Sequence, residues 1–175
     1  WAVLDEGLVA FEDVPEGARV GTASLRRRAQ LLASRPDLRV EELHGNVDTR
    51  LRRLAAGELD AIVLAVAGLR RLSRADEIAF PIPAESMTPA AGQGSLLLQV
   101  RSDDEAALAS VEGLVDGPAL REVTAERTVV ALLEATCNSP LGVHAAVDLE
   151  SGRMRIETFV GLADGSEWLR DRVEG

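Results

Sequence analysis

The sequence contains no lysine and no tyrosine, and it has only one cysteine in 175 residues. A single cysteine excludes an internal disulfide, so we expect a reducing compartment and place the protein in the cytoplasm. Aromatic residues make up 3% of the chain. They offer few surfaces on which bases could stack, and we expect no nucleic-acid partner. No apolar run approaches the roughly 18 residues that a membrane span requires, so we expect no membrane association.

Charge is distributed unevenly along the chain. Residues 19–74 hold twelve arginines and six acidic residues, whereas the remainder holds seven arginines and twenty-three acidic residues. An acidic protein with one basic segment suits a local site for a small anionic ligand rather than a surface for a long polyanion. No spacing typical of metal ligands occurs, and we expect no metal. The first residue is Trp1 rather than methionine, so we expect the chain to begin within a longer one.

Strand and helix patterns alternate over the first 89 residues. The expected strands cover residues 18–22, 38–43 and 60–66, and the expected helices cover residues 25–34 and 47–56. This alternation predicts an α/β domain built on a parallel sheet with helices packed against it.

The second half of the chain has a different pattern. Residues 95–100 predict another apolar strand, and residues 103–114 and 119–136 predict helices. Three further strands are predicted over residues 143–149, 153–160 and 167–173. Short strands separated by glycine turns indicate a small antiparallel sheet, so we expect a second domain of the α+β class.

Basic residues follow each of the three strands expected in the first domain. Ser24, Arg26 and Arg27 follow the first strand, His44 and Arg50 the second, and Arg71 the third. Because the carboxyl ends of parallel strands meet at one edge of a sheet, we expect one convergent anion pocket. The alternative is that these residues cap helices and that the arginines are solvated.

The single cysteine, Cys137, follows the longest predicted helix. A lone cysteine is most often a small buried hydrophobic residue. The alternative is a residue that is alkylated once and then stays modified. His144 lies within a strand pattern, and we expect it to be structural.

Six motifs occur in order along the chain, at residues 21–27, 43–51, 59–65, 67–72, 89–94 and 124–127. In this order they resemble the successive motifs of the porphobilinogen deaminase (hydroxymethylbilane synthase) family. Cys137, followed by Pro-Leu-Gly at residues 140–142, falls where that family carries its cofactor cysteine.

The resemblance implies a three-domain enzyme, two of whose domains are of the periplasmic-binding-protein type. Residues 1–89 would form the second, anion-binding α/β domain. Residues 90–116 would return to a first domain that is largely missing here. Residues 117–175 would form a small α+β domain that bears the cofactor and is truncated.

The activity implied is the head-to-tail joining of four porphobilinogen units, with release of ammonia, to give hydroxymethylbilane in tetrapyrrole (heme) biosynthesis. The cofactor would be a dipyrromethane attached covalently to Cys137, and the protein would be a monomer. By resemblance, the cofactor would be held by Ser24, Arg26, Arg27 and Arg50, and the substrate would be contacted by His44, Arg71 and Gln93. The family's acid/base aspartate lies upstream, so no catalytic residue is assigned here and we expect this chain alone to be inactive.

Two departures from the family pattern leave other functions open. His44 stands where family members usually carry an arginine, and Ala135 and Thr136 replace a usual pair of glycines. A degenerate family member that has lost activity is one alternative. A non-catalytic anion-binding module is another; it explains the arginines but gives Cys137 no role.

Overall fold

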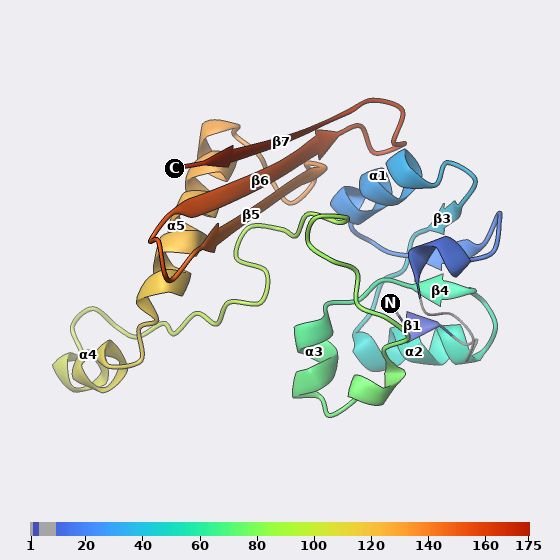
Figure 1. Cartoon of the computed structure of the whole chain (residues 1–175). Coiled ribbons are helices and arrows are strands. Elements are labelled where there is room, and N and C mark those ends of the chain that lie inside the picture. Colours follow the sequence, from blue (N-terminus) through green and yellow to red (C-terminus); the bar gives the residue numbers. More distant parts are fainter. Residues whose placement is uncertain (1, 4–9) are drawn as a thin grey trace.

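A computed structural model of the chain describes residues 2–3 and 10–175. Figure 1 shows a parallel-sheet unit on one side and an antiparallel sheet backed by a helix on the other, with a long connection between them. The predicted mixed α/β architecture is therefore confirmed. No helix within the described residues is long and apolar enough to cross a membrane.

The parallel-sheet unit contains a four-stranded sheet in the order β1-β4-β2-β3. These strands are β1 (Ala2–Val3), β2 (Arg19–Gly21), β3 (Arg39–Glu41) and β4 (Ala61–Ile62). The central strand β2 pairs in parallel with both β3 and β4, as the alternating pattern predicted. Strand β1, which was not predicted, pairs antiparallel with β4.

Two helices connect the parallel strands. Helix α1 (Leu25–Ser34) begins at Ser24, whose hydroxyl accepts the Arg27 N–H at 3.4 Å. Helix α2 (Val47–Ala55) begins at Asn46, whose side chain accepts the Thr49 N–H at 2.9 Å. A side-chain oxygen of this kind satisfies an N–H that has no partner within its own helix.

The core of this unit lies on both faces of the sheet. One buried cluster includes Val20 of β2 and Leu31 of α1. The other includes Ile62 of β4 and Leu54 of α2. A sheet covered on both faces needs strands that are apolar throughout. Strand β4 is shorter than the predicted 60–66, because the chain leaves the sheet after Ile62 and helix α3 (Val66–Arg71) begins at residue 66.

Two short 3₁₀ helices and one isolated helix complete the connections. The 3₁₀ helices are η1 (Phe11–Asp13) and η2 (Ala75–Glu77), and the helix is α4 (Glu105–Glu112). The predicted strand at residues 95–100 is wrong, since the segment pairs with no strand among the described residues. Its apolar side chains at Leu96, Leu97 and Leu98 are 76%, 86% and 57% exposed.

The C-terminal unit is an antiparallel sheet in the order β5-β6-β7, packed against α5. Its elements are α5 (Gly117–Leu132), β5 (Leu141–Val147), β6 (Met154–Gly161) and β7 (Trp168–Glu174). The predicted helix and three antiparallel strands are confirmed. Helix α5 ends four residues before the predicted 136, because the chain turns at Leu133 and Glu134, where φ is +49° at Glu134.

The free edge of β5 is covered by hydrogen bonds from outside the sheet. The Val143 N–H donates to the carbonyl oxygen of Pro89 at 2.9 Å. The Ala145 and Val147 N–H groups donate to the carboxylates of Glu126 and Glu122 at 2.9 and 2.8 Å. Two acidic residues four apart on one helix face therefore satisfy an edge that would otherwise be open to pairing with another chain.

Gly142 of β5 lies directly against Thr88 of the connection. A Cβ at position 142 would meet the Thr88 carbonyl oxygen at 2.7 Å, whereas a Cβ at Gly113 would meet nothing within 4 Å. We expect Gly142→Ala to lower the free energy of unfolding by about 1–3 kcal/mol, since the backbone must shift. Gly113→Ala is the matched control and should change it by less than about 0.5 kcal/mol. Urea unfolding of both variants measures this change. Equal unfolding midpoints for the two variants would show that a methyl group fits between residue 142 and Thr88 without a backbone shift.

Candidate functional site

The first turn of α1 carries two arginines that reach different partners. Arg26 is 6% exposed. It donates to the Thr88 carbonyl oxygen at 2.6 Å and to the Gln93 side-chain oxygen at 3.0 Å. Burial, with a contribution from the charge of Arg27, lowers the pKa of Arg26 to about 10. The guanidinium is still charged at neutral pH, so a positive charge is held inside the molecule.

Arg27 lies beside the end of β4. Its guanidinium donates to the Val63 carbonyl oxygen at 2.9 Å. Burial lowers the pKa of Arg27, and the charge of Arg50 lowers it further. Arg50, in the first turn of α2, donates to the Gly45 carbonyl oxygen at 2.8 Å. The charge of Arg50 thus acts on Arg27, while the two guanidinium groups bind different carbonyl oxygens.

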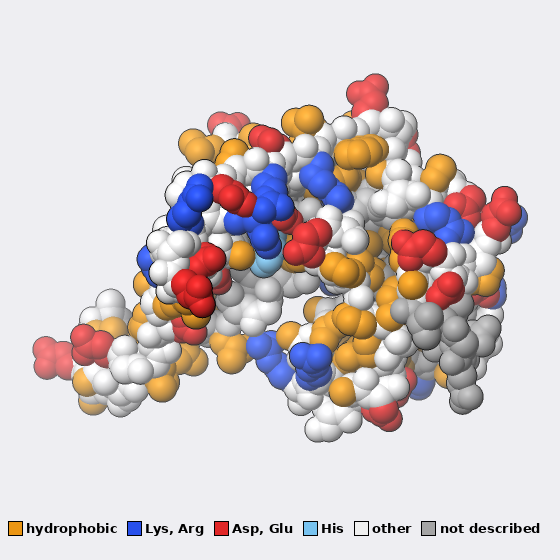
Figure 2. All heavy atoms as spheres, viewed as in Figure 1, with side chains coloured by type: hydrophobic (Ala, Val, Ile, Leu, Met, Phe, Trp, Pro, Cys, Tyr) orange, Lys and Arg blue, Asp and Glu red, His pale blue; other side chains and the backbone are white. Residues whose placement is uncertain are grey.

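We call Arg26, Arg27 and Arg50 the arginine cluster. None of the three forms an ion pair with a carboxylate among the described residues, although arginines elsewhere do, as in Arg19–Asp60 and Arg35–Asp37. Partly buried cations that repel one another and have no counter-charge favour the binding of an anion, which would offset both burial and repulsion. Figure 2 shows basic side chains over α3 at the edge of a hollow between the two units.

A turn at residues 92–94 brings two further predicted residues to the cluster. Gly92 and Gly94 have φ of +70° and +97°, a conformation that favours glycine. Between them, the Gln93 side chain accepts a hydrogen bond from Arg26. Arg71, at the end of α3, donates to the Gly94 carbonyl oxygen at 3.1 Å. Gln93, Arg71 and Arg26 thus meet at this turn.

The other two predicted residues lie differently. The Ser24 hydroxyl is used as the cap of α1. His44 is exposed, and its Nε2 lies 2.7 Å from a carboxylate oxygen of Glu42, with which it forms an ion pair when protonated. His44 therefore contacts an acidic neighbour rather than the arginine cluster.

Cys137 is exposed and lies in the turn that joins α5 to β5. The turn is closed by Thr136 and Ser139, whose N–H groups donate to the Ser139 hydroxyl and the Thr136 carbonyl oxygen, both at 3.0 Å. The alternative of a buried hydrophobic cysteine is wrong. Five residues after Cys137, Gly142 touches Thr88, whose carbonyl also binds Arg26. Five residues span at most about 18 Å, so the Cys137 backbone lies within about 18 Å of Gly142, which adjoins the carbonyl that binds Arg26.

Glu126 of α5 is a buried carboxylate whose role the sequence did not reveal. One of its oxygens accepts the Gly92 N–H at 2.6 Å and the other accepts the Ala145 N–H at 2.9 Å. His144 Nδ1 lies 3.6 Å from the same carboxylate. Burial opposes ionisation of Glu126, but the contacts with His144, Gly92 and Ala145 outweigh it and lower its pKa. Only the tertiary fold shows that one acid joins α5, β5 and the 92–94 turn.

The contact between Glu126 and His144 predicts that the stability of the fold depends on pH. The contact with Glu126 raises the pKa of His144. The contribution of His144 to the stability of the folded state is therefore fully present below the pKa of the histidine in the unfolded chain, about 6.5. It is lost as the pH rises through the higher pKa of His144 in the folded chain. The Glu126 contribution is lost in the opposite direction, as pH falls through its lowered pKa. We expect the stability advantage of the wild type over His144→Asn to be larger at pH 6 than at pH 8.5.

Urea unfolding at the two pH values measures this difference. Glu126→Gln removes the charge that raises the histidine pKa, so it should also diminish the extra stability at pH 6. An advantage over His144→Asn that is the same at both pH values would contradict the ion pair.

Comparison with known proteins shows two family matches along the chain. The family model described as "Porphobilinogen deaminase, dipyromethane cofactor binding domain" matches residues 2–109. The one described as "Porphobilinogen deaminase, C-terminal domain" matches residues 120–175.

Similar proteins named porphobilinogen deaminase occur in several bacteria. The Campylobacter curvus protein is 45% identical over 174 residues, covering 98% of this chain and 55% of that protein. The Brevibacillus brevis protein is 43% identical over 165 residues, covering 94% and 53%. The Thiobacillus denitrificans protein is 47% identical over 174 residues, covering 99% and 56%. The chain spans about half the length of these curated relatives.

Proposed function

The chain belongs to the porphobilinogen deaminase family, and we propose that it is part of an enzyme that makes hydroxymethylbilane. This enzyme joins four porphobilinogen units head to tail and releases ammonia at each addition. Porphobilinogen carries an acetate and a propionate group, so every intermediate is a polycarboxylate. The single observation that supports this role best is the arginine cluster, which holds three cations without a carboxylate partner among the described residues.

We propose that the cofactor is a dipyrromethane joined to the Cys137 sulfur. The residues present fit such a group in two respects. The thiol is exposed on a turn, so it is open to alkylation without unfolding. The residues after Cys137 lead to Gly142, which lies against the Thr88 carbonyl that binds Arg26, and the charges of the arginine cluster suit the carboxylates of two linked pyrroles. When bound, the cofactor supplies the pyrrole position to which the first substrate unit is joined.

The role proposed for each arginine follows from the hydrogen bonds that its guanidinium already makes. Among the described residues, the guanidinium groups of Arg27 and Arg50 each donate one hydrogen bond, to a backbone carbonyl oxygen, so their remaining N–H groups are proposed to bind cofactor carboxylates. Each such charge-assisted contact is worth about 1.5–3 kcal/mol. Arg26 and Ser24 are proposed to complete the cofactor site, Arg26 through its contact with Gln93.

Substrate is proposed to bind beside the cofactor, at the 92–94 turn. Arg71 and Gln93 meet there and offer a cation and an amide. His44 is proposed to contribute a substrate contact by exchanging Glu42 for a substrate carboxylate. The acid/base aspartate is proposed to lie outside this chain.

The domain organisation proposed is that of a three-domain enzyme. Residues 1–89 are proposed as its second domain, of the periplasmic-binding-protein type, which their central parallel strands support. Residues 90–116 are proposed to return to the first domain, and the exposed apolar run Leu96–Leu98 supports this because it needs a partner. Residues 117–175 are proposed as the third domain.

Product formation by the full-length protein that contains this chain tests the proposal. Purified protein given porphobilinogen should release four ammonia molecules for each linear tetrapyrrole, whereas the 175-residue chain alone should release none. Binding of porphobilinogen by the full-length protein without consumption would instead indicate an anion-binding module. Turnover by the chain alone would show that the acid/base residue has been misplaced.

A further inference from the structure

Residues 85–89 pass between α1 and the antiparallel sheet, and α1 holds their backbone through Gln30. This residue is 2% exposed. Its side-chain oxygen accepts the Thr88 N–H at 2.7 Å and its side-chain nitrogen donates to the Thr88 carbonyl oxygen at 3.0 Å. Gln30 therefore pairs with the backbone of Thr88 as a neighbouring strand would.

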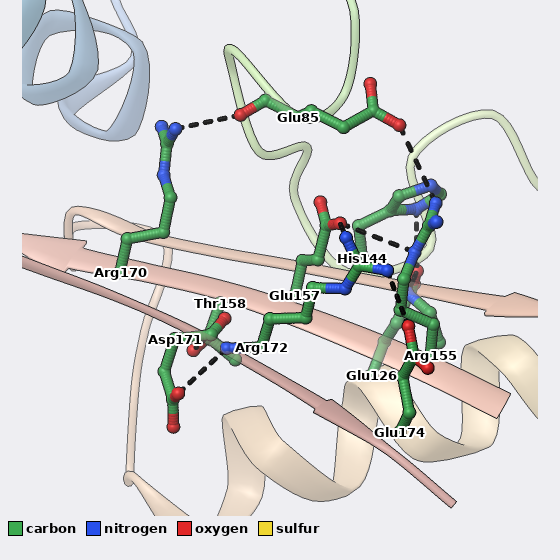
Figure 3. Close-up of polar contacts among 11 residues, drawn as sticks. Glu85, Glu126, His144, Arg155, Glu157, Thr158, Arg170, Asp171, Arg172 and Glu174 are labelled. Carbon is green, nitrogen blue, oxygen red and sulfur yellow. Dashed lines mark hydrogen bonds and ion pairs between the residues drawn. The ribbon is translucent and has the colours of Figure 1, made fainter.

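The antiparallel sheet holds the same segment from the other side. Arg170 of β7 donates to the carbonyl oxygens of Glu85 and Ser86 at 2.8 and 3.2 Å. Arg155 of β6 lies 3.6 Å from the Glu85 carboxylate. Figure 3 shows Glu85 between these two arginines, with a contact to each. The Pro89 carbonyl oxygen completes the set by accepting the Val143 N–H.

The contacts from α1 and those from the antiparallel sheet meet at Thr88, where the packing is tight. Thr88 is 1% exposed, and Gly142 of β5 has no room for a Cβ against it. Arg170 also reaches the Gln30 side-chain oxygen, at 3.5 Å. The segment is thus fixed to both units, on the α1 side through the buried backbone groups of Thr88, which are costly to leave without a partner, and on the side of the antiparallel sheet through the exposed carbonyl oxygens of Glu85 and Ser86.

We propose that Gln30 is a positioning residue that fixes the antiparallel unit relative to α1 through the backbone of residues 85–89. Gln30 lies one helical turn after Arg26 on the same face of α1, and both bind the Thr88 carbonyl oxygen. The segment leads to Gln93, and its partner strand β5 follows the Cys137 turn. Gln30 therefore sets where the Cys137 tether begins relative to the arginine cluster.

This position has a consequence for the enzyme that rests on the proposed function. A polycarboxylate attached at Cys137 reaches the arginine cluster with little loss of conformational freedom only if the two units keep one relative position. Loosening the segment should therefore weaken substrate binding more than it slows the reaction of bound substrate.

Spin-label distances in the 175-residue chain test the positional part directly. One label is placed on Cys137 and the other on Ala55→Cys, at an exposed position of α2. We expect one narrow distance distribution in the otherwise unchanged chain and a distribution at least twofold broader in Gln30→Met. Gln99→Met, which alters an exposed glutamine, is the matched control and should stay narrow. Gln30→Glu keeps the acceptor for the Thr88 N–H but sets a carboxylate oxygen against the Thr88 carbonyl oxygen, so it should also broaden the distribution.

An unchanged distribution in a folded Gln30→Met variant overturns the proposal. Circular dichroism establishes whether that variant is folded. If it is not, Arg170→Met decides the matter, because it loosens the same segment from the exposed side and should also broaden the distribution. A narrow distribution in Arg170→Met would then overturn the proposal.

Kinetics of the full-length enzyme test the functional part. We expect Gln30→Met to raise KM for porphobilinogen about tenfold, the size of one misplaced charge-assisted contact, with a smaller change in kcat. Val14→Ala removes buried side-chain volume elsewhere in the parallel-sheet unit and should leave KM unchanged. An unchanged KM in Gln30→Met refutes the functional part. A wild type without turnover refutes the proposed function instead, and the distance measurement still decides the positional part.

Discussion

Replacing Arg27 with glutamate in the full-length enzyme should lower kcat/KM for porphobilinogen by at least about 100-fold. The change removes a charge-assisted contact worth about 1.5–3 kcal/mol and adds a like charge beside the ligand carboxylates. Each 1.4 kcal/mol corresponds to about tenfold. The effect should be this large because Arg27 has no carboxylate partner among the described residues that could take up the charge. Steady-state kinetics measures it.

Two comparisons separate charge from folding. Arg27→Gln removes the charge without adding an opposite one and keeps a polar side chain, so it should fold and lose activity mainly through the missing charge. Arg153→Glu reverses a charge on an exposed residue near the β5–β6 turn and should leave kcat/KM within about twofold of the wild type. Similar activities for Arg27→Glu and Arg153→Glu would mean that Arg27 is merely a solvated helix residue.

Replacing Cys137 with alanine in the full-length protein should lower hydroxymethylbilane formation by at least about 1,000-fold while leaving the fold intact. The thiol is exposed and, among the described residues, makes a single weak contact, 3.9 Å from the Asn138 side-chain oxygen. Surface changes of this kind alter the free energy of unfolding by less than about 0.5 kcal/mol. Loss of activity would therefore reflect loss of the cofactor attachment point. Product assay and urea unfolding of the same preparation measure both effects.

Cys137→Ser sharpens this experiment because it keeps the size of the side chain and changes its nucleophile. It should be as inactive as Cys137→Ala, since a serine hydroxyl is far less nucleophilic than a cysteine thiolate. An active alanine variant would show that Cys137 does not hold a required group. A variant that unfolds would show instead that the turn after α5 depends on the cysteine for its structure.

Local sequence signals predicted much of the fold. Helices α1 and α2 begin where Ser24 and Asn46 provide caps, and Gly57 follows α2 with φ of +71°. Caps and turn glycines act over three or four residues, so the sequence alone shows them. That Arg27 and Arg50 lie in the first turns of helices at the same edge of the sheet was also predictable, because the parallel strands β2 and β3 present their carboxyl ends there.

Features that depend on distant partners were not predictable. Residues 95–100 have a strand pattern, but no described strand lies beside them, and a strand requires a hydrogen-bonded neighbour. The contacts of Arg26 with Thr88 and Gln93 join residues 62 and 67 apart in sequence. The same holds for the buried carboxylate of Glu126, which reaches Gly92 across 34 residues. Helical periodicity placed these residues on helices without showing what they meet.

The intact mass of the full-length wild-type protein shows whether Cys137 carries a dipyrromethane. We predict a mass that exceeds the bare polypeptide by two linked pyrroles, located by peptide mapping on the segment that contains Cys137. The same protein should give a positive aldehyde colour test for pyrroles. A full-length wild-type protein at its bare polypeptide mass, or one modified on another residue, would contradict the account.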